Sequence, residues 1–151
     1  GHSPGHVALW EPAGRTLLAG DLFSGNGTVA IIPPHGSMLA YLESLRRVRE
    51  LGPRCILPGH GPEITDPELV IDDYIARRLK REQQIRQALA SRPMTIEELV
   101  SELYPDILPH FRRAAAATVL AHLEKLRDQG EVAPESEDAW HARWRRVGVP
   151  A

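Results

Sequence analysis

The segment Pro58-Gly59-His60-Gly61-Pro62 restricts the fold of this chain more than any other stretch. It follows the short apolar run Arg54-Cys55-Ile56-Leu57, which predicts a buried strand that ends in a tight loop. Glycines on both sides of a histidine allow the backbone to turn sharply and carry the imidazole to the rim of a sheet. We therefore expect a sheet with a histidine presented at the end of one strand.

Two other stretches share this design. One is Gly1-His2-Ser3-Pro4-Gly5-His6, and the other is Gly20-Asp21-Leu22-Phe23, which follows an apolar run. Three loops at strand ends would then present His2, Asp21 and His60, whose side chains suit a borderline divalent metal such as zinc. Each residue alone could be a turn residue or a cap, and the repeated design favours the ligand. The other histidines lack ligand spacing, so we expect surface or packing roles for His35, His110, His122 and His141.

Composition limits the class of protein. With 151 residues, 42% of them hydrophobic and 25% charged, the chain fits a soluble globular protein of one ordinary domain or two small ones. A net charge of −2 provides no overall basic field for nucleic acid or an anionic membrane. No apolar run of about 18 residues occurs, so no segment is expected to span a membrane. The single cysteine, Cys55, excludes an internal disulfide and favours a reducing, cytoplasmic location, and its apolar surroundings predict a buried, inert thiol.

The first part of the sequence predicts strands around one helix. Two apolar runs, 7–11 and 15–20, flank a Pro-Ala-Gly turn and predict a β-hairpin. Residues 21–27 are loop by composition, and 28–32 predict a further strand or extended segment. Apolar residues at every third position predict a helix over 38–51, with Leu39, Leu42, Leu45, Val48 and Leu51 on its buried face. With the strand before His60, this order describes half of a sheet-and-helix layer.

The second part of the sequence predicts mainly helices. Asp66-Pro67 signals the start of a long helix that runs to about Ser91, and its charged middle, residues 77–82, is expected to cross solvent between two packed units. A capping box, Thr95-Ile96-Glu97-Glu98, opens a short helix that runs to about Tyr104. A third helix follows, from about residue 110 to Gln129.

Two short strands, near 131–133 and 140–147, are expected after the third helix. Three helices followed by a hairpin are typical of a winged helix. Trp140 and Trp144, four residues apart in the last strand, should lie on one face and cover the small core rather than stack on bases. The alanine run 114–117 suits close packing more than base reading. We place the boundary between two domains near residue 80.

Several motifs carry a resemblance to a known family. The stretches GHSPGH, GDLFSGNGT and ILPGHGPEI resemble the third, fourth and fifth motifs of the metallo-β-lactamase-fold hydrolases, the superfamily that includes glyoxalase II. The later stretches YIARRLKREQQI, TIEELVSELYP and VLAHLEKLRDQG resemble its lactamase-beta-like endoribonuclease branch. The resemblance implies a mixed α/β (α+β) fold, with the C-terminal half of an αββα sandwich over residues 1–80 and a winged-helix domain over 81–151.

The resemblance also implies a site with two zinc ions. In this family pattern His2 completes a three-histidine site, Asp21 bridges the two metals as the catalytic carboxylate, and His60 binds the second metal, while His6 is structural. The family's second motif, HxHxDH, occurs nowhere in the sequence and is expected upstream of Gly1. We therefore expect the chain to be the C-terminal part of a longer enzyme and to be inactive by itself.

The implied activity is hydrolysis by a zinc-activated hydroxide. Single-stranded RNA is the favoured substrate, an ester or thioester is the alternative, and the parent could associate as a homodimer. Arg78 and Arg81 are predicted to bind substrate, although a solvated face is the simpler interpretation of the basic residues. Sequence-specific DNA binding is not expected. The other class of function is a non-enzymatic, nucleic-acid-binding winged helix with a vestigial hydrolase sheet.

Overall fold

A computed structural model describes residues 1–148 of the chain. The chain divides into two compact units, Gly1–Arg78 and the part from Leu79 onward, so the division falls inside one long helix, two residues before the expected boundary at residue 80. The fold is mixed α/β, as predicted from the sequence. Among the residues described, no helix is both long and apolar enough to cross a membrane.

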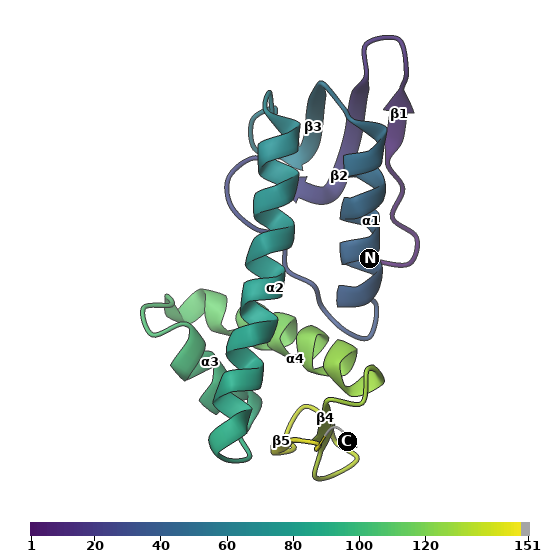
Figure 1. The fold of residues 1–151 in the computed structure, drawn as a ribbon. Coiled ribbons are helices and arrows are strands. Elements are labelled where there is room, and N and C mark those ends of the chain that lie inside the picture. The colour runs from purple at the N-terminus through teal and green to yellow at the C-terminus, as the bar shows by residue number, and fades with distance from the viewer. Residues whose placement is uncertain (149–151) are drawn as a thin grey trace. The chain divides into compact units, whose positions relative to one another are not determined.

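The first unit is built on a three-stranded sheet with the order β1-β2-β3 (Figure 1). Strand β1 (Leu9–Glu11) pairs antiparallel with β2 (Thr16–Ser24), which confirms the predicted hairpin. Strand β2 pairs parallel with β3 (Cys55–His60), and the connection between them contains helix α1 (Met38–Leu51). The sheet therefore has one parallel pair whose carboxyl ends meet at the same edge.

Two predicted loops proved to be strand. Residues 21–24 continue β2, and the glycine-flanked segment up to His60 continues β3. The register between β2 and β3 shifts after Leu18 and again after Gly20, so the strands stay paired through irregularities where composition alone indicated a loop. Residues 28–32, expected as a strand or extended segment, lie outside the strands as irregular backbone, although Ile31 is fully buried.

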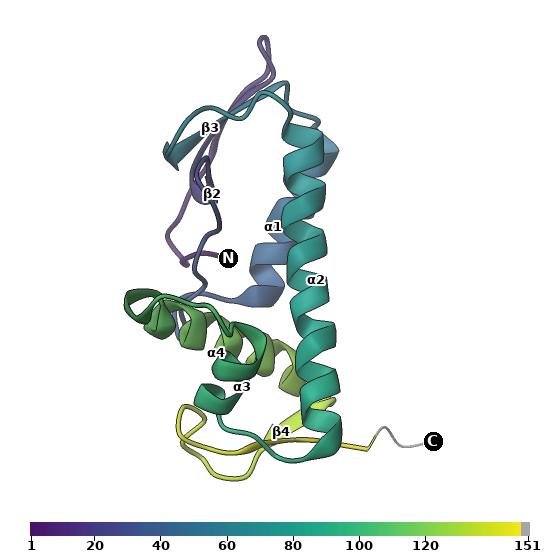
Figure 2. The same cartoon turned by 90° about the vertical axis from the view of Figure 1, so that its left-hand side faces the viewer.

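Helix α1 and the first part of helix α2 (Pro67–Ser91) lie on one face of this sheet (Figures 1 and 2). The buried residues of α1 are Met38, Tyr41, Leu42, Leu45 and Val48. The prediction that Leu39 and Leu51 belong to this face was wrong, since each is 45% exposed. A strict three-residue spacing drifts around a helix of 3.6 residues per turn, so the ends of such a series leave the buried stripe.

The opposite face of the sheet is lined by leucines. The pairing register places Leu9 beside Leu18 and Leu18 beside Leu57, and all three side chains are exposed. On the covered face the neighbouring Leu17 and Ile56 are buried. Side chains alternate between the faces of a strand, so each strand contributes apolar residues to both faces. Such a pattern is typical of a sheet that packs on both sides.

The second unit contains the end of α2, then α3 (Ile96–Leu103), a short 3₁₀ helix (Pro109–Phe111) and α4 (Arg112–Asp128). Strands β4 (Val132–Pro134) and β5 (Trp144–Arg146) then pair antiparallel. The predicted order of three helices and a hairpin is confirmed. The capping box is also confirmed, since Thr95 accepts the N–H of Glu98 and Glu98 accepts the N–H of Thr95.

Trp140 and Trp144 have different environments, contrary to expectation. Trp144 on β5 is fully buried, whereas Trp140 lies in a turn before this strand and is 38% exposed. The prediction failed because β5 is only three residues long, so the spacing of four does not place both indoles on one face of a strand. Ala115, Ala116 and Ala117 are buried, which confirms the close packing expected for the alanine run.

The charged middle of α2 is not the solvated crossing that its composition indicated. Arg78 is only 7% exposed and donates hydrogen bonds to Thr28 Oγ1 (2.9 Å) and the Val29 carbonyl (2.5 Å) within the first unit. Glu82 is 1% exposed and accepts a hydrogen bond from Lys125 Nζ (2.9 Å) within the second. Buried ionic groups require such partners, and here the partners come from distant parts of the sequence.

Candidate metal centre

Asp21 lies between two histidines at one edge of the sheet. Its Oδ1 is 3.3 Å from His60 Nε2, and its Oδ2 is 3.9 Å from His2 Nε2. Asp21 and His60 meet because β2 and β3 run parallel, so residues near their carboxyl ends reach a common edge. His2 arrives from the segment that precedes β1. The structure therefore brings together the three residues that the sequence singled out, and their role as zinc ligands stays a prediction.

The ring of His2 is oriented by the backbone. Its Nδ1 is 3.2 Å from the carbonyl oxygen of Ala30. A carbonyl can only accept a hydrogen bond, so Nδ1 carries the proton and donates it. In the neutral imidazole the lone pair is then on Nε2, the atom that faces Asp21. A metal-binding histidine commonly has this arrangement, in which a carbonyl fixes the tautomer and leaves the other nitrogen free to bind a cation.

Asp21 is positioned by His6 and two glycines. His6 Nε2 accepts the backbone N–H of Asp21 at 2.8 Å, in keeping with the structural role expected for this histidine. Gly20 has a φ of +51°, and a Cβ there would lie 2.5 Å from His6 Nε2. A Cβ on Gly59 would lie 3.0 Å from Asp21 Oδ1. Gly20 therefore requires glycine, because its backbone is left-handed and a side chain would displace the histidine, whereas a side chain at Gly59 would push the Asp21 carboxylate aside.

A pocket of about 430 Å³ opens beside these groups. It is lined by His2, Asp21, Phe23, Ser24, Thr28, Val29, Ala30 and His60. The imidazole of His60 is 81% exposed at this rim, whereas that of His2 is half-buried. Among the residues described, the lining contains no lysine or arginine, and its ionisable side chains are one carboxylate and two imidazoles.

Tyr74 and Arg78 support the pocket wall, and the sequence analysis missed this role. The Tyr74 hydroxyl accepts the N–H of Ser24 (3.2 Å) and donates to the Gly27 carbonyl (2.6 Å). Arg78 holds the next residues through Thr28 and Val29, as described above. The spacing of Tyr74 and Arg78 is the signal that could have found them, since residues four apart on a helix share one face.

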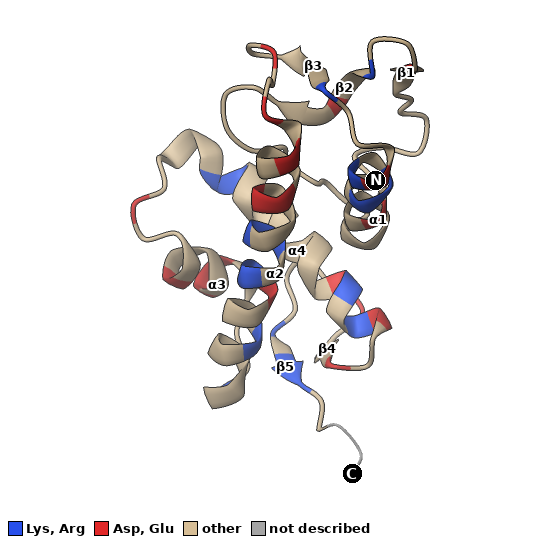
Figure 3. Cartoon of the chain, turned by 45° about the horizontal axis from the view of Figure 1, so that its top comes forward, with Lys and Arg blue, Asp and Glu red and all other residues tan. Residues whose placement is uncertain are grey.

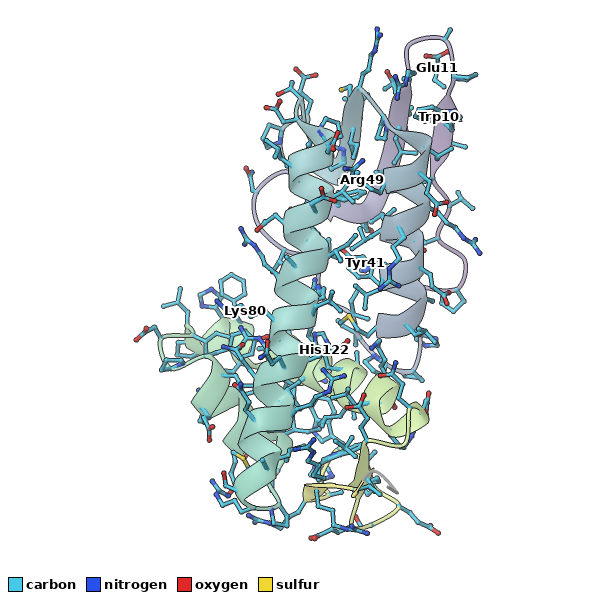
Figure 4. All side chains as sticks on the ribbon, in the orientation of Figure 1. Trp10, Glu11, Tyr41, Arg49, Lys80 and His122 are labelled. Atoms are coloured by element: carbon cyan, nitrogen blue, oxygen red, sulfur yellow. The ribbon has the colours of Figure 1, made fainter. Side chains whose placement is uncertain are left out.

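Arg78 also lies against a buried tyrosine. Its guanidinium carbon is 5.3 Å from the centre of the Tyr41 ring, and Tyr41 donates its hydroxyl proton to the Leu22 carbonyl at 3.0 Å. Burial raises the pKa of Tyr41 to about 12, although the nearby Arg78 charge acts in the opposite direction. Tyr41, labelled in Figure 4, is therefore neutral at physiological pH and acts as a hydrogen-bond donor in the core.

The two arginines predicted to bind substrate have internal partners. Arg78 is buried, and its donors are directed to the loop after β2. Arg81 stacks on Tyr104, with its guanidinium carbon 3.8 Å from the ring centre, and donates to the Leu103 carbonyl at 2.8 Å. Packing accounts for both side chains, so the structure gives a substrate role no additional support, and that role stays a prediction.

The described residues do not form a complete metal cage. Within residues 1–148, no group of three or more His, Cys, Asp or Glu side chains is arranged to hold a metal ion. Each oxygen of Asp21 approaches a different imidazole, so the donors are present as two histidine–carboxylate pairs that share one residue. The donor types fit zinc, and their number fits only part of a site with two ions.

Family comparisons agree with this geometry. Residues 1–60 match the family described as metallo-β-lactamase superfamily, and residues 95–144 match the β-lactamase-associated winged helix domain. The chain thus combines a metallo-β-lactamase superfamily domain with a β-lactamase-associated winged-helix domain.

Individual relatives support the same assignment. The Beta-lactamase-like protein 2 homolog of Caenorhabditis elegans is 34% identical over 133 residues, covering 87% of this chain and 44% of the relative. An atrochrysone carboxyl ACP thioesterase of Aspergillus fumigatus is 32% identical over 89 residues, covering 59% of this chain and 27% of the relative. The crystal structure of a metallo-beta-lactamase family protein from Thermus thermophilus superposes with a TM-score of 0.81 at 30% identity, covering 97% of this chain and 47% of that protein. The chain therefore spans less than half the length of these relatives.

Proposed function

We propose that this chain supplies part of the active site of a zinc-dependent hydrolase with two metal ions. His2 would bind one ion, His60 the other, and Asp21 both. One observation carries the proposal: the two carboxylate oxygens of Asp21 face the Nε2 atoms of two different histidines. A carboxylate in this position can offset the repulsion between two cations. The open leucine-lined face of the sheet also supports a larger hydrolase domain, because half of a sandwich would leave such a face exposed.

In this proposal the chain holds and orients the side chains that would bind the metal ions. When bound, zinc would acidify water and stabilise the negative charge that develops during hydrolysis. His2 is held in the ligand tautomer by Ala30, and the backbone of Asp21 is held by His6. The motif HxHxDH does not occur in these 151 residues, so most coordination positions would be left to water. We expect the chain by itself to bind zinc weakly and to turn over no substrate.

An ester or thioester is the substrate that the pocket favours. Phe23, Val29 and Ala30 in the pocket lining provide apolar contact for an acyl group. The thioesterase relative supports the same choice. Single-stranded RNA is the second candidate. It is supported by the exposed side chains of Arg145 and Arg146 on β5, where Figure 3 shows a basic segment. A cytoplasmic location also remains our proposal.

The test compares this chain with its longer parent. Zinc content and zinc-dependent hydrolysis are measured with an acyl thioester and with a labelled single-stranded oligoribonucleotide. In the parent, Asp21→Asn and His60→Ala should lose zinc and activity together, and the matched control His35→Ala, an exposed histidine away from the pocket, should retain both. Full activity of the Asp21→Asn parent would refute the metal role. Metal-dependent turnover by the 151-residue chain alone would refute its predicted inactivity.

The non-enzymatic alternative makes a different prediction. If the winged helix binds nucleic acid and the sheet is vestigial, RNA binding should weaken steeply with salt and should be the same for Asp21→Asn and wild type. The parent would then show no zinc-dependent hydrolysis of either substrate. The hydrolase and the non-enzymatic nucleic-acid-binding protein are thus distinguished by whether Asp21→Asn abolishes zinc-dependent hydrolysis.

A further inference from the structure

We propose that the winged-helix unit contains a second binding site, which takes one nucleotide unit with its base on Trp140 and its phosphate at Arg113. The site is a pocket of about 700 Å³. Its lining includes Trp140, His141, Arg112, Arg113, Glu97 and Ala116. All of these residues belong to the second unit, so the site depends on none of the proposed metal ligands.

The turn that carries Trp140 is fixed by hydrogen bonds. Asp138 accepts the backbone N–H groups of Trp140 (3.1 Å) and His141 (3.3 Å) through Oδ1, and its Oδ2 is 2.8 Å from His141 Nδ1. The indole N–H of the buried Trp144 donates to the Ala139 carbonyl at 2.9 Å and ties the turn to the core. The exposed Trp140 is therefore presented by ordered backbone, which lowers the entropic cost of stacking a ligand on it.

The part of the pocket lining that comes from α4 carries positive charge. Arg112 and Arg113 are exposed in the first turn of α4, and Arg112 is held by a hydrogen bond from its Nη2 to Ser101 Oγ (2.8 Å). Ala116, one turn further along α4, also lines the pocket and adds only a small side chain. Guanidinium groups bind phosphate oxygens in a bidentate manner, so Arg113 can hold the anionic end of a ligand.

The combination of groups identifies the ligand class. An inorganic anion would use the arginines without the indole, and an apolar peptide would use the indole without the arginines. A nucleotide uses both, because its base stacks on an aromatic ring and its phosphate pairs with a cation. The carboxylate of Glu97 can accept a hydrogen bond from an exocyclic amino group. The pocket therefore fits an amino-bearing base with its phosphate, either within a single strand or as a free nucleotide.

The experiment measures binding by the whole 151-residue chain without metal. Fluorescence anisotropy in the presence of a chelator is recorded with labelled single-stranded oligoadenylate, and free AMP serves as the competitor. Trp140→Ala should weaken oligoadenylate binding about tenfold, whereas Trp140→Phe, which keeps an aromatic face, should stay within about threefold of wild type. Arg113→Ala should weaken binding about fivefold and reduce the salt dependence by about one counterion.

Arg127→Ala is the matched control, because Arg127 is an exposed arginine of α4 whose guanidinium pairs with Asp128 away from the pocket. It should leave the affinity unchanged. Equal losses in Arg113→Ala and Arg127→Ala would show non-specific electrostatics and overturn the site, and so would wild-type affinity in Trp140→Ala. Strong competition by AMP would identify a free nucleotide as a sufficient ligand, whereas weak competition would identify a single strand. Zinc-dependent hydrolysis is absent from this assay, so its outcome is separate from that of the proposed enzyme.

Discussion

Replacing Lys125 by methionine tests how the second unit accommodates a buried carboxylate. Glu82 on α2 is almost completely buried and interacts with three groups of positive or potentially positive charge. Its carboxylate is 2.9 Å from Lys125 Nζ, 3.5 Å from His122 Nδ1 and 3.7 Å from Arg86 Nη2. His122, labelled in Figure 4, lies on α4. Methionine keeps the length of the lysine stem and removes the ammonium group, which also donates to Gln129 Oε1 at 3.2 Å, so packing of the stem changes little.

The expected loss of stability follows from the short distance to Lys125. Two unit charges 2.9 Å apart attract by about 6 kcal/mol at an effective dielectric constant of about 20, before the cost of removing both from water is subtracted. Removing one partner of a buried pair typically costs about 3–5 kcal/mol. Arg86 and His122 still face Glu82 in the variant. We therefore expect Lys125→Met to lower the free energy of unfolding by about 3 kcal/mol near neutral pH.

The pH dependence of the free energy of unfolding provides a second test of this ion pair. Burial acts to raise the pKa of Glu82, but hydrogen bonds and charge from His122 and Lys125 outweigh it, so the pKa lies below the ordinary value of 4.5. The folded state then binds this proton less readily than the unfolded state. The stabilisation is fully present above pH about 4.5 and is lost as the pH falls through the lower folded value. In Lys125→Met the burial effect is less opposed, so the pKa of Glu82 rises above its wild-type value, and the stability deficit should narrow as the pH falls from about 7 to below 4.5.

Urea denaturation, followed by fluorescence of the buried Trp144, measures both effects. Lys80→Met is the matched control, because Lys80 is an exposed lysine of α2, labelled in Figure 4, and its loss should change the free energy of unfolding by less than about 0.5 kcal/mol. Equal stabilities of Lys125→Met and Lys80→Met would refute the buried ion pair. A deficit that stays constant from pH about 7 to below 4.5 would refute the attribution to the Glu82 charge.

Three further predictions concern individual contacts. Tyr74→Phe removes the hydroxyl that ties the loop after β2, leaves its backbone groups without that partner, and should lower the free energy of unfolding by about 1–3 kcal/mol in thermal denaturation. Gly59→Ala places a Cβ 3.0 Å from Asp21 Oδ1 and should weaken zinc binding by the longer parent about tenfold in a calorimetric titration, with the fold unchanged by circular dichroism. A backbone hydrogen bond and nearby arginines lower the pKa of Glu98 to about 2, so its NMR titration midpoint should lie near 2 and should rise in Arg143→Ala, which removes a guanidinium 3.1 Å from the carboxylate.

Local signals in the sequence predicted the helices well. The proline after Asp66 marks the start of α2, and the observed helix Pro67–Ser91 has the expected ends. The capping box predicted α3, because its two hydrogen bonds form within four consecutive residues and need no partner elsewhere. Such features depend only on neighbouring residues, so sequence alone contains the information that determines them.

Burial of charged residues could not be predicted in the same way. Arg78 and Glu82 lie one turn apart in a strongly charged part of α2, and composition indicated a solvated helix. Arg78 is paired with Thr28 and Val29, which lie much earlier in the sequence. Glu82 is paired with Lys125, which lies much later. A buried charge is acceptable only where a partner is within reach, and tertiary structure decides this. The prediction that Cys55 is buried was also wrong, since its side chain is half-buried.

In the candidate site, too, some features follow from neighbouring residues, and others depend on residues distant in the sequence. The repeated glycine-flanked design selected His2, Asp21 and His60, and the parallel pairing of β2 with β3 explains why two of them meet. The tautomer of His2 was not predictable, because it depends on the Ala30 carbonyl, which belongs to an irregular segment 28 residues away. The pocket wall likewise depends on Tyr74, which reaches the loop after β2 from a helix much later in the chain.

The segment before β1 contacts Asp21 through two different histidines. A stretch without regular structure therefore contributes two of the side chains around this carboxylate. His6 fixes the backbone of Asp21 through its N–H, while His2 faces the carboxylate of the same residue. The absence of a side chain on Gly20 allows the His6 ring to approach so closely. A cation at Asp21 would therefore attach the segment to β2 through the side chain as well as the backbone. Metal binding and ordering of this segment should then be coupled, since each lowers the entropic cost of the other.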